Sequence, residues 1–124
     1  MKTAYQAIIE AMTLYFDGLY HSDTVRLGKV FHPDAQYVCA TEGTLTHLAM
    51  DAYFPVVDKR PSPASRNEQR LDRIVSIEFA GRVTAFVRAE CVIGPKFFTD
   101  LLTFICIDGR WQIIAKVFHF DLRD

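Results

Sequence analysis

Apolar residues recur at intervals of three and four in the first part of the chain, which is the period of an amphipathic helix. This pattern predicts a helix over residues 4–20 with Thr3 as its N-cap. A second, shorter helix capped by Ser22 is expected to end at Phe31, because the residue before Pro33 avoids helical backbone angles. A third helix is predicted over residues 47–58, with Thr46 as its cap and a kink at Pro55.

The rest of the chain has the composition of strands and turns. A short strand is predicted over residues 36–40, and a loop over residues 59–69. Four longer strands follow over residues 71–79, 82–93, 96–107 and 110–122, separated by Ala80-Gly81, Gly94-Pro95 and Asp108-Gly109. Short consecutive turns predict an antiparallel meander. Helices followed by strands are typical of an α+β domain, in which helices cover one face of a sheet.

The Asp108-Gly109 dipeptide favours a two-residue type I′ turn, which fixes the register of the last two strands. The predicted cross-strand pairs are Ile107 with Arg110, Phe104 with Ile113, Asp100 with Val117, and Phe98 with His119. Asp100 and His119 then become diagonal neighbours on one face, ~7–8 Å apart by Cα. The alternation of small and apolar residues over 83–93 identifies this face as the one beneath the helices.

The two faces of the predicted sheet suggest a pocket and an interface. Ala85, Ala89 and Ala115 are small, so the helices are not expected to fill the concave face around Asp100. The opposite face combines polar residues with an apolar set large enough to predict a homodimer through the sheet. This set is Phe86, Val92, Phe97, Leu101, Ile105, Ile107, Ile114, Phe118 and Phe120, and Lys116 is assigned to the same face.

Composition excludes several classes of protein. The 124 residues, half of them apolar, predict a single domain over residues 1–124. A formal charge of -1 argues against nucleic acid as a partner, and no apolar run is long enough for a membrane span. Three cysteines without a close-spaced pair indicate a cytoplasmic protein. Motifs for metal ions, phosphates, dinucleotide cofactors and nucleophilic catalysis are absent, so no cofactor and no metal are expected.

Four segments resemble a known family: Tyr15-Phe16-Asp17-Gly18, Phe31-His32-Pro33-Asp34-Ala35, Phe98-Thr99-Asp100-Leu101-Leu102, and the stretch from Asp108 to His119, DGRWQIIAKVFH. Together with three helices before a curved meander, they are similar to the putative lumazine-binding branch of the nuclear-transport-factor-2-like superfamily. That superfamily also includes ketosteroid isomerase and polyketide-cyclase-like proteins. The resemblance covers essentially the whole chain and implies a cone-shaped α+β barrel, a pocket and a dimer, but no specific activity.

Asp100, His119, Tyr15 and Asp34 are the candidate catalytic residues. A carboxyl group buried among apolar residues can serve as a general acid, and a histidine can shuttle protons at neutral pH. A phenol that points into a cavity can stabilise a developing oxyanion, as the tyrosine of ketosteroid isomerase does. Each also has a structural interpretation: Asp100 and His119 as a satisfied core pair, Tyr15 as a packed residue, and Asp34 as a turn residue. Candidate ligand-binding residues are His32, Tyr37, Tyr53, Phe98 and Trp111.

Three functions remain open from the sequence. The first is a cone-fold protein that binds a small apolar or cyclic ligand, anchored by Asp100 and His119. The second is an isomerase, dehydratase or cyclase that moves a proton next to a carbonyl group. The third is a non-catalytic dimeric interaction module, in which Asp100 and His119 only contact each other. Whether the cone is open or filled discriminates between them.

Overall fold

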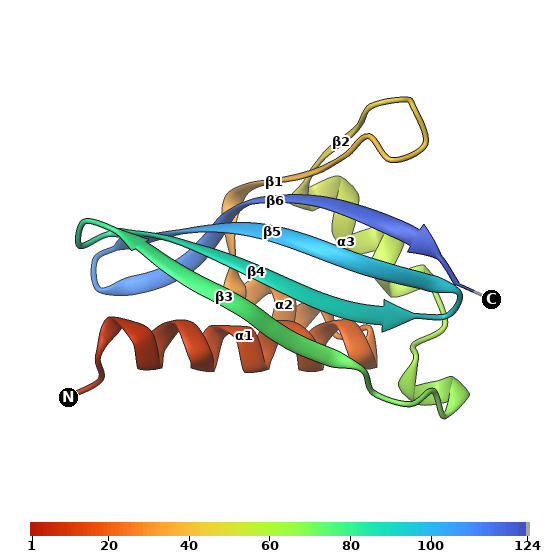
Figure 1. Cartoon of the computed structure of the whole chain (residues 1–124), viewed down its shortest axis with the longest axis horizontal. Coiled ribbons are helices and arrows are strands. Elements are labelled where there is room, and N and C mark those ends of the chain that lie inside the picture. The colour runs from red at the N-terminus through yellow and green to blue at the C-terminus, as the bar shows by residue number, and fades with distance from the viewer. Residues whose placement is uncertain (124) are drawn as a thin grey trace.

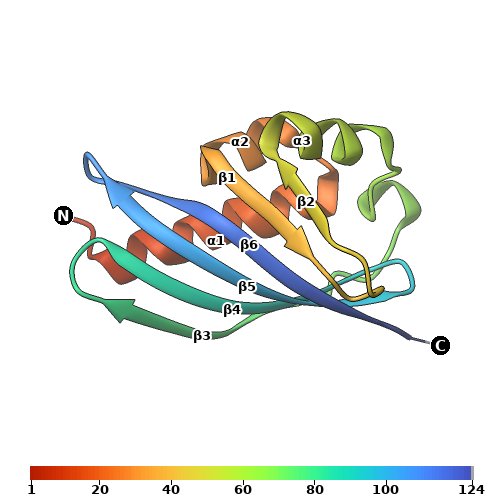
Figure 2. The same cartoon turned by 90° about the horizontal axis from the view of Figure 1, so that it is seen from above.

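The computed structural model describes residues 1–123, in which three helices pack on a six-stranded curved sheet (Figures 1 and 2). The helices are α1 (Ala4–His21), α2 (Thr24–Val30) and α3 (Met50–Lys59), with a short 3-10 helix, η1 (Ala64–Arg66). The strands are β1 (Phe31–Cys39), β2 (Thr46–Ala49), β3 (Asp72–Ala80), β4 (Thr84–Ile93), β5 (Lys96–Ile107) and β6 (Arg110–Leu122). The predicted α+β class is confirmed.

Helix α1 lies along one face of the sheet and begins as the sequence predicts. The Thr3 hydroxyl oxygen accepts from the backbone N–H of Gln6, and the side-chain oxygen of Gln6 accepts from the backbone N–H of Thr3, which forms a capping box. Its buried stripe packs into the core cluster and consists of Ile8, Ala11, Met12, Tyr15, Phe16 and Leu19. The predicted Ser22 cap of the second helix is wrong. Ser22 ends α1 in the left-handed conformation, and Asp23 caps α2 by accepting from Val25 and Arg26.

The predicted third helix starts three residues too early. Residues 46–49 form β2, which pairs antiparallel with β1, so Thr46 is a strand residue and α3 begins at Met50. A four-residue edge strand gives too short a pattern to distinguish from the first turn of a helix. Its conformation is set by the hydrogen bonds that it makes with β1.

The sheet is mixed, in the order β2-β1-β6-β5-β4-β3, whereas an antiparallel sheet is expected from the sequence. Strand β1 runs parallel to β6 and joins the meander to the β1–β2 hairpin. The predicted register across Gly94-Pro95 is confirmed, with Ala89 opposite Asp100 and Cys91 opposite Phe98. The covered face of β4 is also confirmed, since Ala85, Val87, Ala89 and Cys91 are buried.

Strand β6 contains the main departure from the predicted register. Asp108 and Gly109 both have positive φ, as a type I′ turn requires, and the pairing follows the prediction as far as Phe104 and Ile113. Thr103 then pairs with Ala115, so Ile114 is an extra residue, a β-bulge. A shift by one residue exchanges the two faces of a strand.

Every residue of β6 beyond the bulge therefore faces the opposite side from the one expected. Asp100 lies opposite Phe118, and Thr99 lies opposite His119. Lys116 and Phe118 are buried in the interior, while His119 is on the outer surface. The expected Asp100–His119 pair does not form, and the assignment of Lys116 and Phe118 to the outer face is wrong.

In the part of the chain that the structure describes, no helix combines the length and apolar character needed to cross a membrane.

Candidate functional site

Asp100 is the centre of a buried polar cluster. It lies in the middle of β5 with 0% of its surface exposed. The Tyr15 hydroxyl donates to Asp100 Oδ2 at 2.5 Å, and Lys116 Nζ lies 3.9 Å from the same oxygen. The other carboxylate oxygen, Oδ1, is buried and has no hydrogen-bond partner among residues 1–123. Buried carboxylate oxygens normally find a partner, so Oδ1 is available to a further group.

Three elements bring this cluster together. Tyr15 belongs to the buried stripe of α1, four residues from both Ala11 and Leu19, and therefore points at the sheet. Asp100 faces inward between Phe98 and Leu102 by the alternation of β5. Lys116 reaches the same interior only because the bulge at Ile114 reverses the face of β6.

Aromatic rings surround the Lys116 ammonium group. Nζ lies 5.2 Å from the ring centre of Tyr15, 5.5 Å from Tyr37, 5.9 Å from Tyr53 and 5.2 Å from Phe118. Tyr37 and Tyr53 stack on each other, with ring centres 4.2 Å apart. Ring faces attract a cation within about 6 Å, so these rings compensate part of the hydration that Lys116 loses.

Burial and the neighbouring charges together shift the pKa values of Lys116, Tyr15 and Tyr37. Burial lowers the pKa of Lys116 and is the largest single effect, but the charge of Asp100 together with smaller contributions from Tyr53, Tyr37 and Cys91 outweighs it, so the pKa lies above its usual value. Burial, with a contribution from Asp100, raises the pKa of Tyr15 well above that of a free phenol. Burial likewise raises the pKa of Tyr37 to about 12. At neutral pH the cluster therefore contains an ammonium group and neutral phenols.

A segment from residue 60 to residue 71 crosses the end of the cone between α3 and β3 (Figure 1). Glu68 attaches it on two sides. Its carbonyl accepts from the Tyr20 hydroxyl at 2.7 Å, and its Oε1 accepts from the backbone N–H of Gly94 at 2.8 Å. A cavity of about 20 Å³ beneath this segment is lined by Phe16, Leu19, Tyr20 and Cys91 among others, but not by Asp100 or Lys116. The cavity therefore does not extend to the Asp100 cluster.

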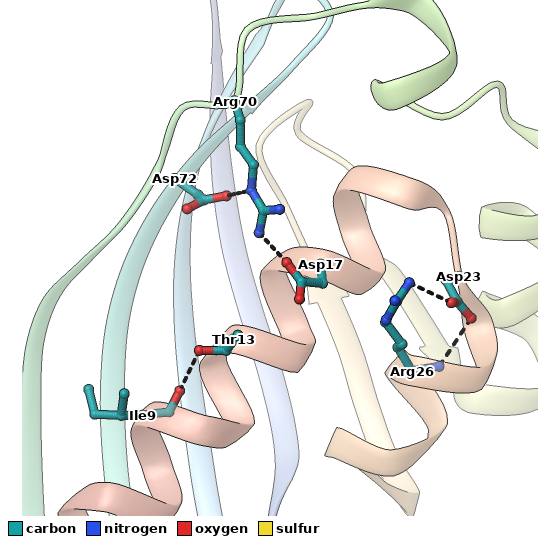
Figure 3. A network of polar contacts seen from close by, with 7 residues as sticks. All are labelled: Ile9, Thr13, Asp17, Asp23, Arg26, Arg70 and Asp72. Atoms are coloured by element: carbon teal, nitrogen blue, oxygen red, sulfur yellow. Dashed lines mark hydrogen bonds and ion pairs between the residues drawn. The ribbon is translucent and has the colours of Figure 1, made fainter.

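Arg70 anchors the same segment from outside (Figure 3). It donates to Asp17 of α1 at 2.6 Å and to Asp72 of β3 at 2.7 Å, and its guanidinium lies over the Tyr20 ring. Figure 3 also shows Asp23, the N-cap of α2, accepting from Arg26 of that helix, a separate local pair. Arg70 therefore joins α1 to the start of β3 at the end of the cone.

Arg60 follows α3 directly and sends its guanidinium inward. Both Nε and Nη2 are buried and have no hydrogen-bond partner among residues 1–123. Arg60 falls in the loop predicted over residues 59–69, and no local pattern indicates that its guanidinium nitrogens are buried. Lys116 was also missed, although it is the one charged residue in the apolar run from Ile113 to Phe118.

The structure brings together only some of the residues predicted for the site. Tyr15, Asp100, Tyr37 and Tyr53 surround Lys116, and Phe98 packs on Phe118 beside them. His119 lies outside, with 55% of its side chain exposed, between Thr41 Oγ1 at 2.8 Å and Asp121 Oδ1 at 2.9 Å.

The other three predicted site residues are also away from Asp100. Asp34 is 88% exposed, and its backbone N–H donates to His32 Nδ1 at 3.0 Å. Asp34 lines an open groove of about 420 Å³ beside β2, on the periphery of the sheet. Trp111 packs on Phe79, next to the β5–β6 turn. Within residues 1–123, no three His, Cys, Asp or Glu side chains gather as metal ligands would.

Solved structures share this fold. An NTF2-like protein of unknown function from Shewanella baltica OS155 superposes with a TM-score of 0.85 at 23% identity, covering 98% of each chain. An NTF-2 like protein of unknown function from Silicibacter pomeroyi DSS-3 gives 0.79 at 22% identity, over 98% of this chain and 100% of that one. A ketosteroid isomerase-like protein from Erwinia carotovora atroseptica gives 0.71 at 14% identity, over 92% and 93% of the two chains. At these identities the likeness establishes the NTF2-like fold.

Sequence comparison identifies the family. The chain is 28% identical to a protein named Aldolase FrzH from Cladobotryum sp over 120 residues, which is 95% of this chain and 92% of that protein. The family described as "Putative lumazine-binding" matches residues 3–119, nearly the whole chain. The chain therefore belongs to the "Putative lumazine-binding" family.

Proposed function

We propose that this protein is an enzyme that removes a proton from the carbon next to a carbonyl group, with Asp100 as the base. The observation that carries the proposal is the Oδ1 atom of Asp100, a buried carboxylate oxygen with no partner among residues 1–123. The second carboxylate oxygen is held by Tyr15, which leaves Oδ1 as the free acceptor. A desolvated carboxylate oxygen that accepts no hydrogen bond is a suitable base for carbon acids.

The roles of the cluster follow from its charges. The proton moves from the α-carbon to Asp100 Oδ1, the electron pair of the C–H bond becomes the C=C bond of an enolate, and negative charge develops on the carbonyl oxygen. The Lys116 ammonium group stabilises that oxygen, since the pKa of Lys116 lies above its usual value. Tyr15, a neutral phenol, keeps Asp100 in position through its 2.5 Å bond to Oδ2.

The name of the relative supports this class of reaction. An aldol reaction starts from an enol or enolate that attacks a second carbonyl group, and the Cladobotryum protein is named an aldolase. Aldol chemistry can also use a neutral lysine, which forms an imine with the substrate. Asp100 raises the pKa of Lys116, which favours the cation and hence the enolate route.

The test uses proton exchange and carbon–carbon cleavage. In D₂O, the protein is expected to accelerate α-deuteration of small cyclic and open-chain ketones, and to cleave a fluorogenic β-hydroxy ketone by a retro-aldol reaction. Asp100→Asn should lower both rates by roughly 10²–10⁴-fold, the usual contribution of a positioned base. Asp121→Asn, the same change on an exposed carboxylate of β6, should leave them unaltered. Equal rates for wild type and Asp100→Asn would exclude Asp100 as the base.

Binding without catalysis is the second candidate, and the stacked rings of Tyr37 and Tyr53 favour it. An apolar cyclic ligand could add to that stack beside Lys116. A ligand that co-purifies with the protein and binds wild type and Asp100→Asn equally, while neither variant exchanges α-protons, would support this candidate over the enzyme.

We also propose that two copies of the chain associate through the outer face of the sheet. Phe86, Leu101, Ile105 and Val117 supply apolar area there, and exposed Arg88 makes no ion pair among residues 1–123. A face that mixes apolar and charged groups suits an isologous contact, in which the same patch meets itself across a twofold axis.

A reducing, cytoplasmic location is proposed as well. The support is that Cys39, Cys91 and Cys106 are all free, as expected where thiols stay reduced.

A further inference from the structure

Arg60 is the one guanidinium whose donors are buried without an acceptor in the part of the chain that the structure describes. Its backbone ends α3, with the N–H donating to the carbonyl of Val57 at 3.3 Å. Four other arginines, Arg26, Arg66, Arg70 and Arg73, each pair with a carboxylate. Leaving charged donors buried and unpaired is costly, so such a group usually has a partner that binds to it.

Arg60 directly follows α3, whose Tyr53 and Val57 are buried, and Tyr53 is one of the rings around Lys116. The charge of Arg60 lowers the pKa of Tyr37 and of Cys91, opposing the rise that burial causes in both. Tyr37 lies over Lys116, and Cys91 lies on the covered face of β4, next to the strand that carries Asp100. Asp72, another charge that acts on Cys91, is paired with Arg70. Arg60 therefore lies near Tyr37 and Cys91, at the start of the segment over residues 60–71.

The free donors have a specific geometry and charge. Nε and Nη2 lie on one edge of the planar guanidinium and point the same way, which matches the two oxygens of a carboxylate. Asp100 and Lys116 neutralise each other, whereas half-buried Arg60 has no ion-pair partner among residues 1–123, so its single positive charge is uncompensated. One monoanion compensates it, whereas a phosphate dianion would leave a net negative charge in a buried site.

We propose that the ligand of this site is a carbonyl compound that also carries a carboxylate, such as a keto acid. The carboxylate binds the Nε–Nη2 edge of Arg60, while the carbonyl group lies between Lys116 and Asp100 Oδ1. The proposal rests on the proposed function for the position of the carbonyl group. The binding of the carboxylate by Arg60 is tested separately from it.

The experiment measures binding by calorimetry for matched pairs of compounds: pyruvate and acetone, phenylpyruvate and phenylacetone, levulinate and 2-pentanone. A charge-assisted bidentate contact should make the acid of a pair bind roughly 10–100-fold more tightly than its neutral partner. Arg60→Gln should abolish this preference, and Arg73→Gln, the same change at an exposed arginine, should retain it. The melting temperature of ligand-free Arg60→Gln should not fall, because the variant removes an unpaired charge.

Three results would overturn the proposal: no preference for the acid in any pair, an unchanged preference in Arg60→Gln, or tighter binding of phenylphosphonate than of phenylpyruvate. A lower melting temperature of Arg60→Gln with the preference intact would assign Arg60 to stability instead. Failure of the proposed function looks different. In that case the acids bind through Arg60 in both wild type and Asp100→Asn, and neither protein exchanges α-protons.

Discussion

At the scale of single residues, the stability and the chemistry of the interior both depend on Lys116. Its side chain is 6% exposed, yet its only ion pair in the described chain is the 3.9 Å contact with Asp100. The rings of Tyr15, Tyr37, Tyr53 and Phe118 supply the remaining stabilisation. Removing one partner of such a buried ion pair lowers the free energy of unfolding strongly, whereas replacing both partners with apolar residues of similar size changes it little.

Lys116→Met is accordingly expected to destabilise the protein by roughly 3–5 kcal/mol, because it leaves Asp100 charged and buried. The double variant Asp100→Leu with Lys116→Met should recover most of that loss. Denaturant unfolding of the two single variants and the double variant completes the cycle. Additive losses would show that the two residues do not act as a pair.

A residue's burial can be predicted from the sequence where its immediate neighbours in the chain decide its position. The apolar surroundings of Asp100 and the helical stripe of Tyr15 predict that both are internal, and both are. Lys116, Arg60 and His119 could not be placed in this way, because their positions depend on a bulge and on a helix end rather than on local alternation.

At the scale of elements, the register of β6 illustrates the same limit. The Asp108-Gly109 turn fixes the first cross-strand pairs through backbone geometry, and these pairs are confirmed. The bulge at Ile114 carries no local signal. Its position coincides with the place where β1 joins β6 in parallel and also shifts register, between Phe31 and Gln36. Long-range pairing therefore decides where the strand changes face.

The segment over residues 60–71 gives a prediction at this scale. Glu68→Ala removes the acceptor for the Gly94 N–H and leaves the Tyr20 contact with the Glu68 carbonyl in place. Backbone amides of residues 60–71 should exchange with deuterium about 10-fold faster, as expected for the loss of one hydrogen bond to a charged group.

Glu42→Ala, in the exposed turn between β1 and β2, is the control for that measurement. It should not alter exchange over residues 60–71. Equal exchange in wild type and Glu68→Ala would mean that Glu68 does not hold the segment closed.

At the scale of the whole molecule, the fold was predictable and the filling of its interior was not. Helices followed by a meander, and the segments that resemble the family, predict the α+β cone. The parallel β1–β6 pairing joins segments far apart in the chain, beyond the reach of turn signals. Ala115, expected beside a pocket, lies beyond the bulge and faces away from Asp100. The interior beside Asp100 contains Lys116 and Tyr53, which come from elements that meet only in three dimensions.

The proposed homodimer predicts a particle of two chains in solution. Light scattering at micromolar concentration should give twice the chain mass of 14.2 kDa. Leu101→Lys with Val117→Lys should give a monomer, because four added charges would meet across the twofold contact. Val83→Lys, an exposed apolar residue beside the β3–β4 turn, is the control and should remain dimeric. A wild-type mass of one chain would refute the proposed interface.

The bulge also divides β6 into two parts in which different alternate residues face the interior. Before Ile114 the residues that face the interior have odd numbers, like Ile113. After it they have even numbers, like Lys116 and Phe118. A sequence that lacks Ile114 would keep all the later residues opposite the same partners on β5. A one-residue gap at this point therefore leaves the inward and outward faces of β6 unchanged. The same gap placed after Lys116 would exchange inside for outside over the end of the strand. In any relative, the lysine equivalent to Lys116 has to be found by counting back from the end of β6, not forward from its turn.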